Sequence, residues 1–302
     1  QVDPGDVMVS TGASEAIGAA IMALVEPGQE VVVFEPYFDL YAAVIELAGG
    51  VRRAVTLRTP DYSFDPDELE AVINPSTRLI LVNTPHNPTG KVFSEAELAA
   101  IARLANTHDL LVVTDEVYEH MTYDGTRHIP LATLPGMAER TVTISSGGKS
   151  FGLTGWKVGW AHGPTELVNA VHTVKQHLSF TSGAPFQRAM VTALNLGDGY
   201  FTGLADDLCA KRDLVDDGLR SVGLHVLPAQ GTYYVTADVA PLGYDDGMDF
   251  CRDLPGRCGV VAIPNRVFYD DESAGRSIVR FAYCKQFEVL HEAVERLSRL
   301  TA

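Results

Sequence analysis

A glycine-rich loop at residues 145–157 holds two of the six lysines of the chain, Lys149 and Lys157. The apolar, β-branched run at residues 141–145 leads directly into it. A strand followed by glycines and a Lys-Ser pair is typical of loops that bind the phosphates of nucleotides. The loop therefore predicts an anion site, and nucleotide binding is the first hypothesis to test.

The nucleotide hypothesis fails at two points of the motif. The required pattern is G-x-x-x-x-G-K-[ST]. Gly148, Lys149 and Ser150 match its end, but Thr143 stands where the first glycine belongs. Residues 151–155 then carry two more glycines and make a poor helix start. The loop must serve another chemistry.

A second candidate anion site follows the predicted strand at residues 7–9. Gly12 makes a turn there, and Ala13 and Ser14 open an alanine-rich helix. The first N–H groups of a helix lack partners within the helix and lie at the positive end of its dipole, so they suit an anion. A simple helix cap at Ser14 explains the same residues, so the two interpretations stay open at this point.

Two more polar groups follow buried strands, at the edge where ligands bind in open α/β sheets. Asn87 lies in a rigid turn with two prolines and a glycine, after the strand predicted at residues 79–83. Asp115 directly follows the strand at residues 110–114, and Tyr118 comes three residues later. That spacing allows Asp115 and Tyr118 to face one ligand, although an acid at this place can also act only as a helix cap.

The elements that position these residues alternate between short apolar strands and helices, which predicts an α/β fold with a mostly parallel sheet between two helical layers. The strands are expected at residues 31–34, 79–83, 110–114, 141–145 and 158–161, with helices at 41–48 and 94–107. After about residue 190 the pattern changes to a smaller α+β arrangement. Its helix is expected at 206–222, its strands at 232–236, 260–263 and 278–283, and a final helix from Glu288. We therefore predict a large domain at residues 1–190 and a small C-terminal domain at residues 191–302.

Composition narrows the class of partner. The formal net charge of −16 opposes binding to nucleic acid. No apolar run is long enough to span a bilayer, and no signal peptide is recognised, so we expect a cytoplasmic protein without a membrane partner. The four cysteines form no CxxC pair, and Cys251 and Cys258 have no accompanying histidines, so neither disulfides nor a metal site is expected.

The sites together suit a phosphate, an aromatic ring and a reactive lysine, and here the chain resembles a known family. Over essentially its whole length it is similar to the class I/II aminotransferases, the pyridoxal-phosphate-dependent enzymes with the aspartate aminotransferase fold (fold type I). Three motifs carry the resemblance, in the expected order: Asn-Thr-Pro-His-Asn-Pro-Thr-Gly at 83–90, Thr-Asp-Glu-Val-Tyr at 114–118, and Ser-Ser-Gly-Gly-Lys-Ser-Phe at 145–151, followed by Gly-Trp-Lys-Val-Gly-Trp. Residues 119–120, 137–141, 183–187 and 241–246 carry a narrower likeness to the kynurenine/glutamine/methionine branch and to actinobacterial N-succinyldiaminopimelate aminotransferases.

The resemblance implies a role for each ring-facing residue. Lys149 would form the Schiff base with the cofactor and then move a proton between the substrate and the cofactor. Asp115 would lie against the pyridine nitrogen and keep it protonated. Tyr118 and Asn87 would hydrogen-bond the phenolic oxygen, and Phe38 would stack on the ring, although core packing alone also explains a phenylalanine.

The remaining implied contacts concern anions. The backbone of Ala13 and Ser14, the Ser146 hydroxyl and Lys157 would bind the phosphate, where many relatives have arginine in place of Lys157. Arg280, inside an apolar strand, would bind the α-carboxylate of the substrate in two hydrogen bonds, although a strand-edge salt bridge is the alternative. Asn83 would support Asn87 or touch that carboxylate.

The resemblance implies transfer of an amino group from an amino acid to a 2-oxo acid, expected to be 2-oxoglutarate, by a homodimer. The first expectation for the donor is N-succinyl-LL-diaminopimelate, in lysine biosynthesis. Kynurenine, glutamine or methionine transamination, β-elimination on cysteine conjugates, and an effector-sensing domain of a transcriptional regulator remain alternatives. Family members carry a further N-terminal segment that covers the substrate, so we also expect a fragment that turns over poorly and whose donor preference its own residues leave undefined.

Overall fold

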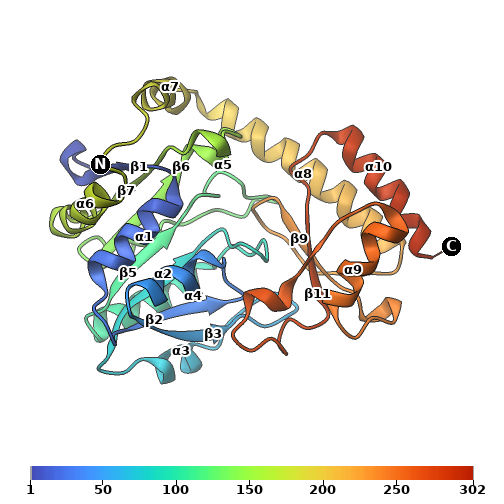
Figure 1. Ribbon diagram of the computed structural model, residues 1–302, viewed down its shortest axis with the longest axis horizontal. Coiled ribbons are helices and arrows are strands. Elements are labelled where there is room, and N and C mark those ends of the chain that lie inside the picture. Colours follow the sequence, from blue (N-terminus) through green and yellow to red (C-terminus); the bar gives the residue numbers. More distant parts are fainter. Residues whose placement is uncertain (1, 302) are drawn as a thin grey trace.

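The computed structural model describes residues 2–301 and contains two β-sheets, each with its own helices (Figure 1). The larger sheet has seven strands in the order β1-β7-β6-β5-β4-β2-β3. Strands β2 to β6 pair in parallel, and β7 runs antiparallel to both β6 and β1. The strands are β1 (Val7–Ser10), β2 (Glu30–Glu35), β3 (Val51–Thr56), β4 (Thr77–Asn83), β5 (Leu111–Asp115), β6 (Thr141–Ser146) and β7 (Gly159–His162).

Helices cover both faces of this sheet because its central strands are apolar on both sides. On one face Val31 and Val33 pack with Ile17, Ile21 and other residues of α1, α2 and α6. On the opposite face, the alternating residues of the same strands pack against α3 and α4. The helices of this part are α1 (Ala13–Leu24), α2 (Leu40–Leu47), α3 (Pro66–Val72), α4 (Glu95–Thr107), α5 (Gly147–Ser150), α6 (Thr165–Ser179) and α7 (Ala184–Leu194). The predicted three-layer α/β/α class is confirmed.

The smaller sheet has four antiparallel strands in the order β10-β11-β9-β8. They are β8 (His225–Val226), β9 (Tyr234–Asp238), β10 (Ile263–Pro264) and β11 (Ile278–Ala282), with helices α8 (Asp198–Ser221), α9 (Gly247–Cys258) and α10 (Phe287–Leu297). Figure 1 shows α8 running from the large sheet toward this smaller sheet, and α10 lying beside it. Short 3-10 helices occur at η1 (Pro4–Asp6), η2 (Leu131–Thr133), η3 (Thr154–Trp156), η4 (Ala240–Leu242), η5 (Asn265–Phe268) and η6 (Ser298–Leu300).

Several predicted boundaries were wrong by a few residues, for local reasons. Helix α8 begins at Asp198, whereas the sequence predicted a start at residue 206. The prediction was late because two glycines in the first turns of the helix lower its intrinsic helix propensity. Strand β9 begins at Tyr234 rather than 232, since Thr232 has a φ of 69°, which a strand does not accommodate. Strand β10 is limited to Ile263–Pro264. The division predicted after residue 190 falls inside α7 and stays a prediction.

None of the helices within residues 2–301 combines the length and the apolarity that crossing a bilayer requires.

Candidate active site

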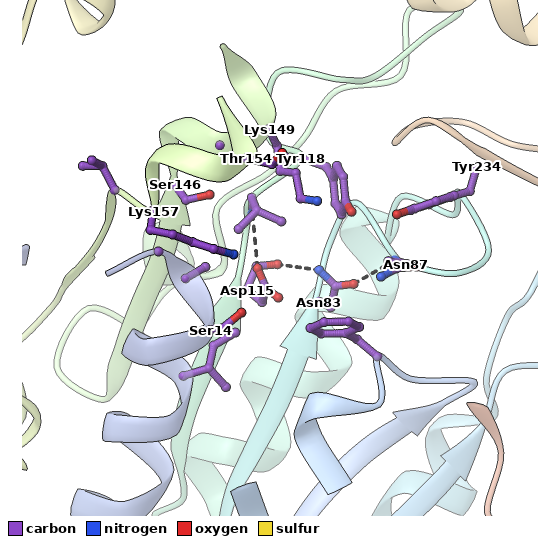
Figure 2. Close-up of a pocket in the computed structure, with 17 residues that line it drawn as sticks. Ser14, Asn83, Asn87, Asp115, Tyr118, Ser146, Lys149, Thr154, Lys157 and Tyr234 are labelled. Carbon is purple, nitrogen blue, oxygen red and sulfur yellow. Dashed lines mark hydrogen bonds between the residues drawn. The ribbon is translucent and has the colours of Figure 1, made fainter. Parts of the chain in front are cut away.

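A cavity of about 220 Å³ lies where β4, β5 and β6 end and α1 and α5 begin (Figure 2). All nine residues that the sequence assigned to a cofactor site line this cavity: Ala13, Ser14, Phe38, Asn87, Asp115, Tyr118, Ser146, Lys149 and Lys157. They come from six separate segments of the chain, which the parallel sheet gathers at one edge. Arg280 is the one predicted site residue outside the cavity lining, and it reaches the cavity through Asn87.

Asp115 ends β5 and is buried in the wall of the cavity. Its Oδ2 accepts a hydrogen bond of 2.7 Å from the Tyr41 hydroxyl, and its Oδ1 accepts a longer one of 3.4 Å from the Val117 amide. Burial raises the pKa of Asp115 to about 6, against the lowering effects of those two bonds and of the Lys149 charge. A carboxyl held in this way is suited to a cationic partner, since a positive charge beside it would favour its ionised form.

Two asparagines connect Asp115 to the far side of the cavity. Asn83 donates from Nδ2 to the Asp115 carbonyl at 2.8 Å and accepts the Asn87 amide at its Oδ1 at 2.7 Å, as the dashed lines in Figure 2 mark. The predicted support of Asn87 by Asn83 is therefore present. Asn87 then accepts a bond of 2.7 Å from Nη1 of Arg280.

Arg280 lies in β11 between two aromatic rings. Its guanidinium carbon is 4.2 Å from the ring centroid of Tyr234 and 5.0 Å from that of Phe268. One hydrogen bond and two contacts with aromatic rings thus hold the guanidinium of Arg280. No acidic side chain within residues 2–301 forms a salt bridge with this guanidinium. The alternative of a strand-edge salt bridge is therefore wrong for Arg280.

Lys149 lies in the short helix α5 and lines the cavity (Figure 2). Its Nζ donates to the Tyr233 hydroxyl at 2.7 Å and lies 5.6 Å from the ring centroid of Tyr118. Tyr118 and Tyr233 meet edge to face at 5.3 Å, and burial raises the pKa of Tyr118 well above its ordinary value. Tyr118 therefore stays protonated and can donate a hydrogen bond into the cavity.

The opposite end of the cavity is built for an anion. Gly12 is the N-cap residue of α1 and has a φ of 79°. Within the part of the chain that the structure describes, this N-cap position gives the first turn of the helix no side-chain hydrogen bond. The backbone of Gly159 approaches so closely that a Cβ there would lie 2.5 Å from the carbonyl carbon of Gly12. Figure 2 shows Ser146 and Lys157 close to this helix start. Backbone N–H groups, a hydroxyl and a lysine amine are the donors that bind phosphate.

The sequence did not identify three contributors: Tyr41, Tyr233 and Tyr234. Tyr41 holds Asp115, Tyr233 bonds to Lys149, and Tyr234 stacks on Arg280. Tyr41 stands three residues after Phe38, which is helical spacing and a signal for a shared face. The pair at 233–234 carries no comparable pattern, because its partners come from distant segments.

The residues present fit pyridoxal phosphate. The start of α1, Ser146 and Lys157 can bind its phosphate. The buried Asp115 suits its basic ring nitrogen, and the amine of Lys149 can react with its aldehyde. These three requirements meet around one cavity.

Comparison with known proteins gives the same result. Residues 1–297 match the family model described as aminotransferase class I and II. The chain belongs to this family and is a pyridoxal-phosphate-dependent aminotransferase, which moves an amino group between an amino acid and a 2-oxo acid.

Individual relatives extend the comparison. The relative named "Probable N-succinyldiaminopimelate aminotransferase DapC", of Mycobacterium tuberculosis, is 48% identical, over 98% of this chain and 77% of the relative. The kynurenine–oxoglutarate transaminase of Dictyostelium discoideum is 38% identical, over 98% of this chain and 76% of the relative. The solved structure of N-succinyldiaminopimelate aminotransferase from Mycobacterium tuberculosis superposes with a TM-score of 0.97 at 48% identity, over 99% of this chain and 79% of that one.

Proposed function

We propose that the protein transfers the amino group of N-succinyl-LL-diaminopimelate to 2-oxoglutarate, a step of lysine biosynthesis. The identity of 48% with the Mycobacterium tuberculosis relative, over nearly the whole chain, is the observation that carries this proposal. The kynurenine transaminase relative is 38% identical, so the donor class is the part that an experiment has to test.

Lys149 is the proposed catalytic residue. Pyridoxal phosphate, when bound, supplies an aldehyde that carries the amino group and a ring that accepts the electron pair left at the donor's Cα. The Lys149 amine would hold this aldehyde, and it would take and return the proton at the donor's Cα. Its bond of 2.7 Å to the Tyr233 hydroxyl restricts where the freed amine can point.

Asp115, Tyr118 and Asn87 are proposed to orient and polarise the ring. The carboxylate of Asp115 keeps the ring nitrogen protonated, and Tyr41 fixes the direction of that carboxylate. Tyr118 and Asn87 would donate hydrogen bonds to the phenolic oxygen. Phe38, which lines the cavity, would pack on the ring face and exclude water from it.

The two anions are proposed to bind at opposite ends of the cavity. The backbone of Ala13 and Ser14, with Ser146 and Lys157, binds the phosphate. Arg280 binds the α-carboxylate of the amino acid and of the 2-oxo acid in turn, because both partners carry this group in the same place.

We also propose a cytoplasmic homodimer that covers the exposed apolar side chains of α6, α7 and the segment between them. Phe180, directly after α6, is 75% exposed, and Leu178 of α6 and Phe186, Val191 and Leu194 of α7 are exposed as well. Single exposed apolar residues are ordinary, but five within 17 consecutive positions indicate an interface. Sedimentation should report a dimer for the natural sequence and a monomer for Phe180→Glu; a monomeric natural protein would disprove the proposal.

A donor panel tests the substrate. N-succinyl-LL-diaminopimelate, kynurenine, glutamine and methionine are each supplied with 2-oxoglutarate, and glutamate formation is followed. The proposal expects the succinylated donor to have the highest kcat/KM. A higher kcat/KM for kynurenine or methionine would move the protein to the other branch, and release of pyruvate from a cysteine conjugate would reveal β-elimination.

A further inference from the structure

The turn at residues 268–270 carries one of the two rings that contact Arg280, and hydrogen bonds also tie this turn to the large sheet. The backbone amide of Tyr37 donates to the Phe268 carbonyl at 2.9 Å. The backbone amide of Asp270 donates to Oε2 of Glu35 at 2.7 Å. Both partners flank the end of β2, more than two hundred residues earlier in the chain.

Side chains strengthen this contact. The Tyr37 hydroxyl donates to Oδ1 of Asp270 at 2.6 Å, and Nη2 of Arg52 donates to the same oxygen at 3.1 Å. Tyr37 is only 5% exposed, and burial, together with the hydrogen bond to Asp270, raises its pKa far above the ordinary value. Asp270 is 38% exposed, so water screens its ion pair with Arg52, and the bond from the buried Tyr37 is the shorter of the two.

The two ends of this contact continue into the two halves of the site. Phe38, which lines the cavity, is the residue after Tyr37. Phe268 lies two residues before Asp270, and its ring packs on the guanidinium of Arg280 at 5.0 Å. A shift of the turn would therefore move one of the two rings that orient Arg280, whereas Phe38 keeps its own helical contact with Tyr41, whose amide donates to the Phe38 carbonyl at 3.0 Å.

We propose that Tyr37 is a positioning residue for Arg280. Its hydrogen bond to Asp270 holds the turn that carries Phe268, and the Phe268 ring orients the carboxylate-binding guanidinium of Arg280 relative to the cavity. This inference rests on the proposed role of Arg280 as the carboxylate ligand. The inference makes a specific claim. Binding of the carboxylate substrates depends on the hydrogen bond between Tyr37 and Asp270, whereas binding of the cofactor does not.

The test compares Tyr37→Phe with Tyr244→Phe. Tyr37→Phe keeps the ring and removes only the hydroxyl. The Tyr244 hydroxyl also donates to an aspartate at 3.0 Å, but this aspartate is Asp253, which lies on α9 rather than in the Phe268 turn. Tyr244→Phe removes the same kind of hydrogen bond and is therefore a matched control. Titration calorimetry measures the Kd of 2-oxoglutarate for the cofactor-loaded protein, fluorescence measures the Kd of pyridoxal phosphate, and steady-state kinetics give KM for donor and acceptor.

Tyr37→Phe should raise the Kd of 2-oxoglutarate and both KM values roughly fivefold, which corresponds to about 1 kcal/mol. It should change kcat less than twofold and leave the Kd of pyridoxal phosphate unchanged, and Tyr244→Phe should change none of these. Unchanged carboxylate binding in Tyr37→Phe, or an equal loss of cofactor and carboxylate binding, would overturn the inference.

The double variant Tyr37→Phe/Arg280→Ala separates this inference from the proposed function. If Tyr37 acts through Arg280, the double variant binds 2-oxoglutarate no more weakly than Arg280→Ala alone, because the two effects share one path. Additive losses would show that Tyr37 acts elsewhere. If Arg280→Ala itself leaves carboxylate binding intact, the proposed role of Arg280 fails, and the inference fails with it.

Discussion

The buried carboxyl of Asp115 makes the stability of the cofactor-free protein depend on pH in a direction that can be measured. Burial raises the pKa of Asp115 to about 6, from an ordinary 3.8. A carboxyl with this shift binds more protons in the folded than in the unfolded protein, so the free energy of unfolding falls as pH rises from 3.8 through 6. A shift of about two units corresponds to roughly 3 kcal/mol that is present below this window and lost above it.

Asp115→Asn removes the charge and keeps an oxygen that can accept the hydrogen bond from Tyr41. Without cofactor, this variant should be more stable than the natural protein at pH 7.5, by roughly 3 kcal/mol, because it has no buried charge to desolvate. The difference should shrink toward zero at pH 4, where Asp115 is already neutral. Asp206→Asn is the control, since Asp206 is exposed and the change in net charge is the same.

Urea unfolding at pH 4, 5, 6 and 7.5, followed by the fluorescence of Trp156 and Trp160, measures this difference. The reasoning fails if Asp115→Asn and the natural protein differ by the same free energy at every pH. Pyridoxal phosphate should reverse the order at pH 7.5, because a protonated ring nitrogen compensates the ionised carboxylate of the natural protein but not the amide. A larger stabilisation of Asp115→Asn by the cofactor would contradict the proposed place of the ring nitrogen.

Three further substitutions test other parts of the site. Lys149→Ala should lose the visible absorption band that borohydride abolishes in the natural protein, and a lysine adduct that persists after reduction would show that another amine holds the cofactor. Arg280→Ala should raise KM for donor and acceptor roughly a hundredfold, for a charge-assisted pair of about 2–3 kcal/mol, with the Kd of pyridoxal phosphate unchanged; equal KM values in the two proteins would limit Arg280 to a structural role. Gly159→Ala should weaken pyridoxal phosphate binding at least tenfold, since its Cβ would meet the backbone at the start of α1 at 2.5 Å, and calorimetry showing normal affinity would exclude that close approach.

Much of the fold could be predicted because its strands are short, apolar on both faces and separated by helices. This pattern is local, and it located β2, β4, β5 and β6 to within about two residues. The start of α8 was predicted eight residues late, since glycines weaken the local signal there, and the strand predicted at residues 260–263 is limited to β10 (Ile263–Pro264). Strand β7 was located to within one residue, but its antiparallel direction between β1 and β6 is a consequence of packing.

The sequence by itself determined which chemical groups the site contains, because residues at the ends of parallel strands must share one edge of the sheet. Lys149, Asp115 and Asn87 could be named for that reason alone, and the family motifs supplied their expected roles. Only the tertiary structure decided how these groups are held. Tyr41 of α2 reaches Asp115 across 74 positions, and Arg280 of the small sheet reaches Asn87 across 193. No local pattern encodes contacts between residues so far apart in the sequence, because they form only when the helices and sheets pack together.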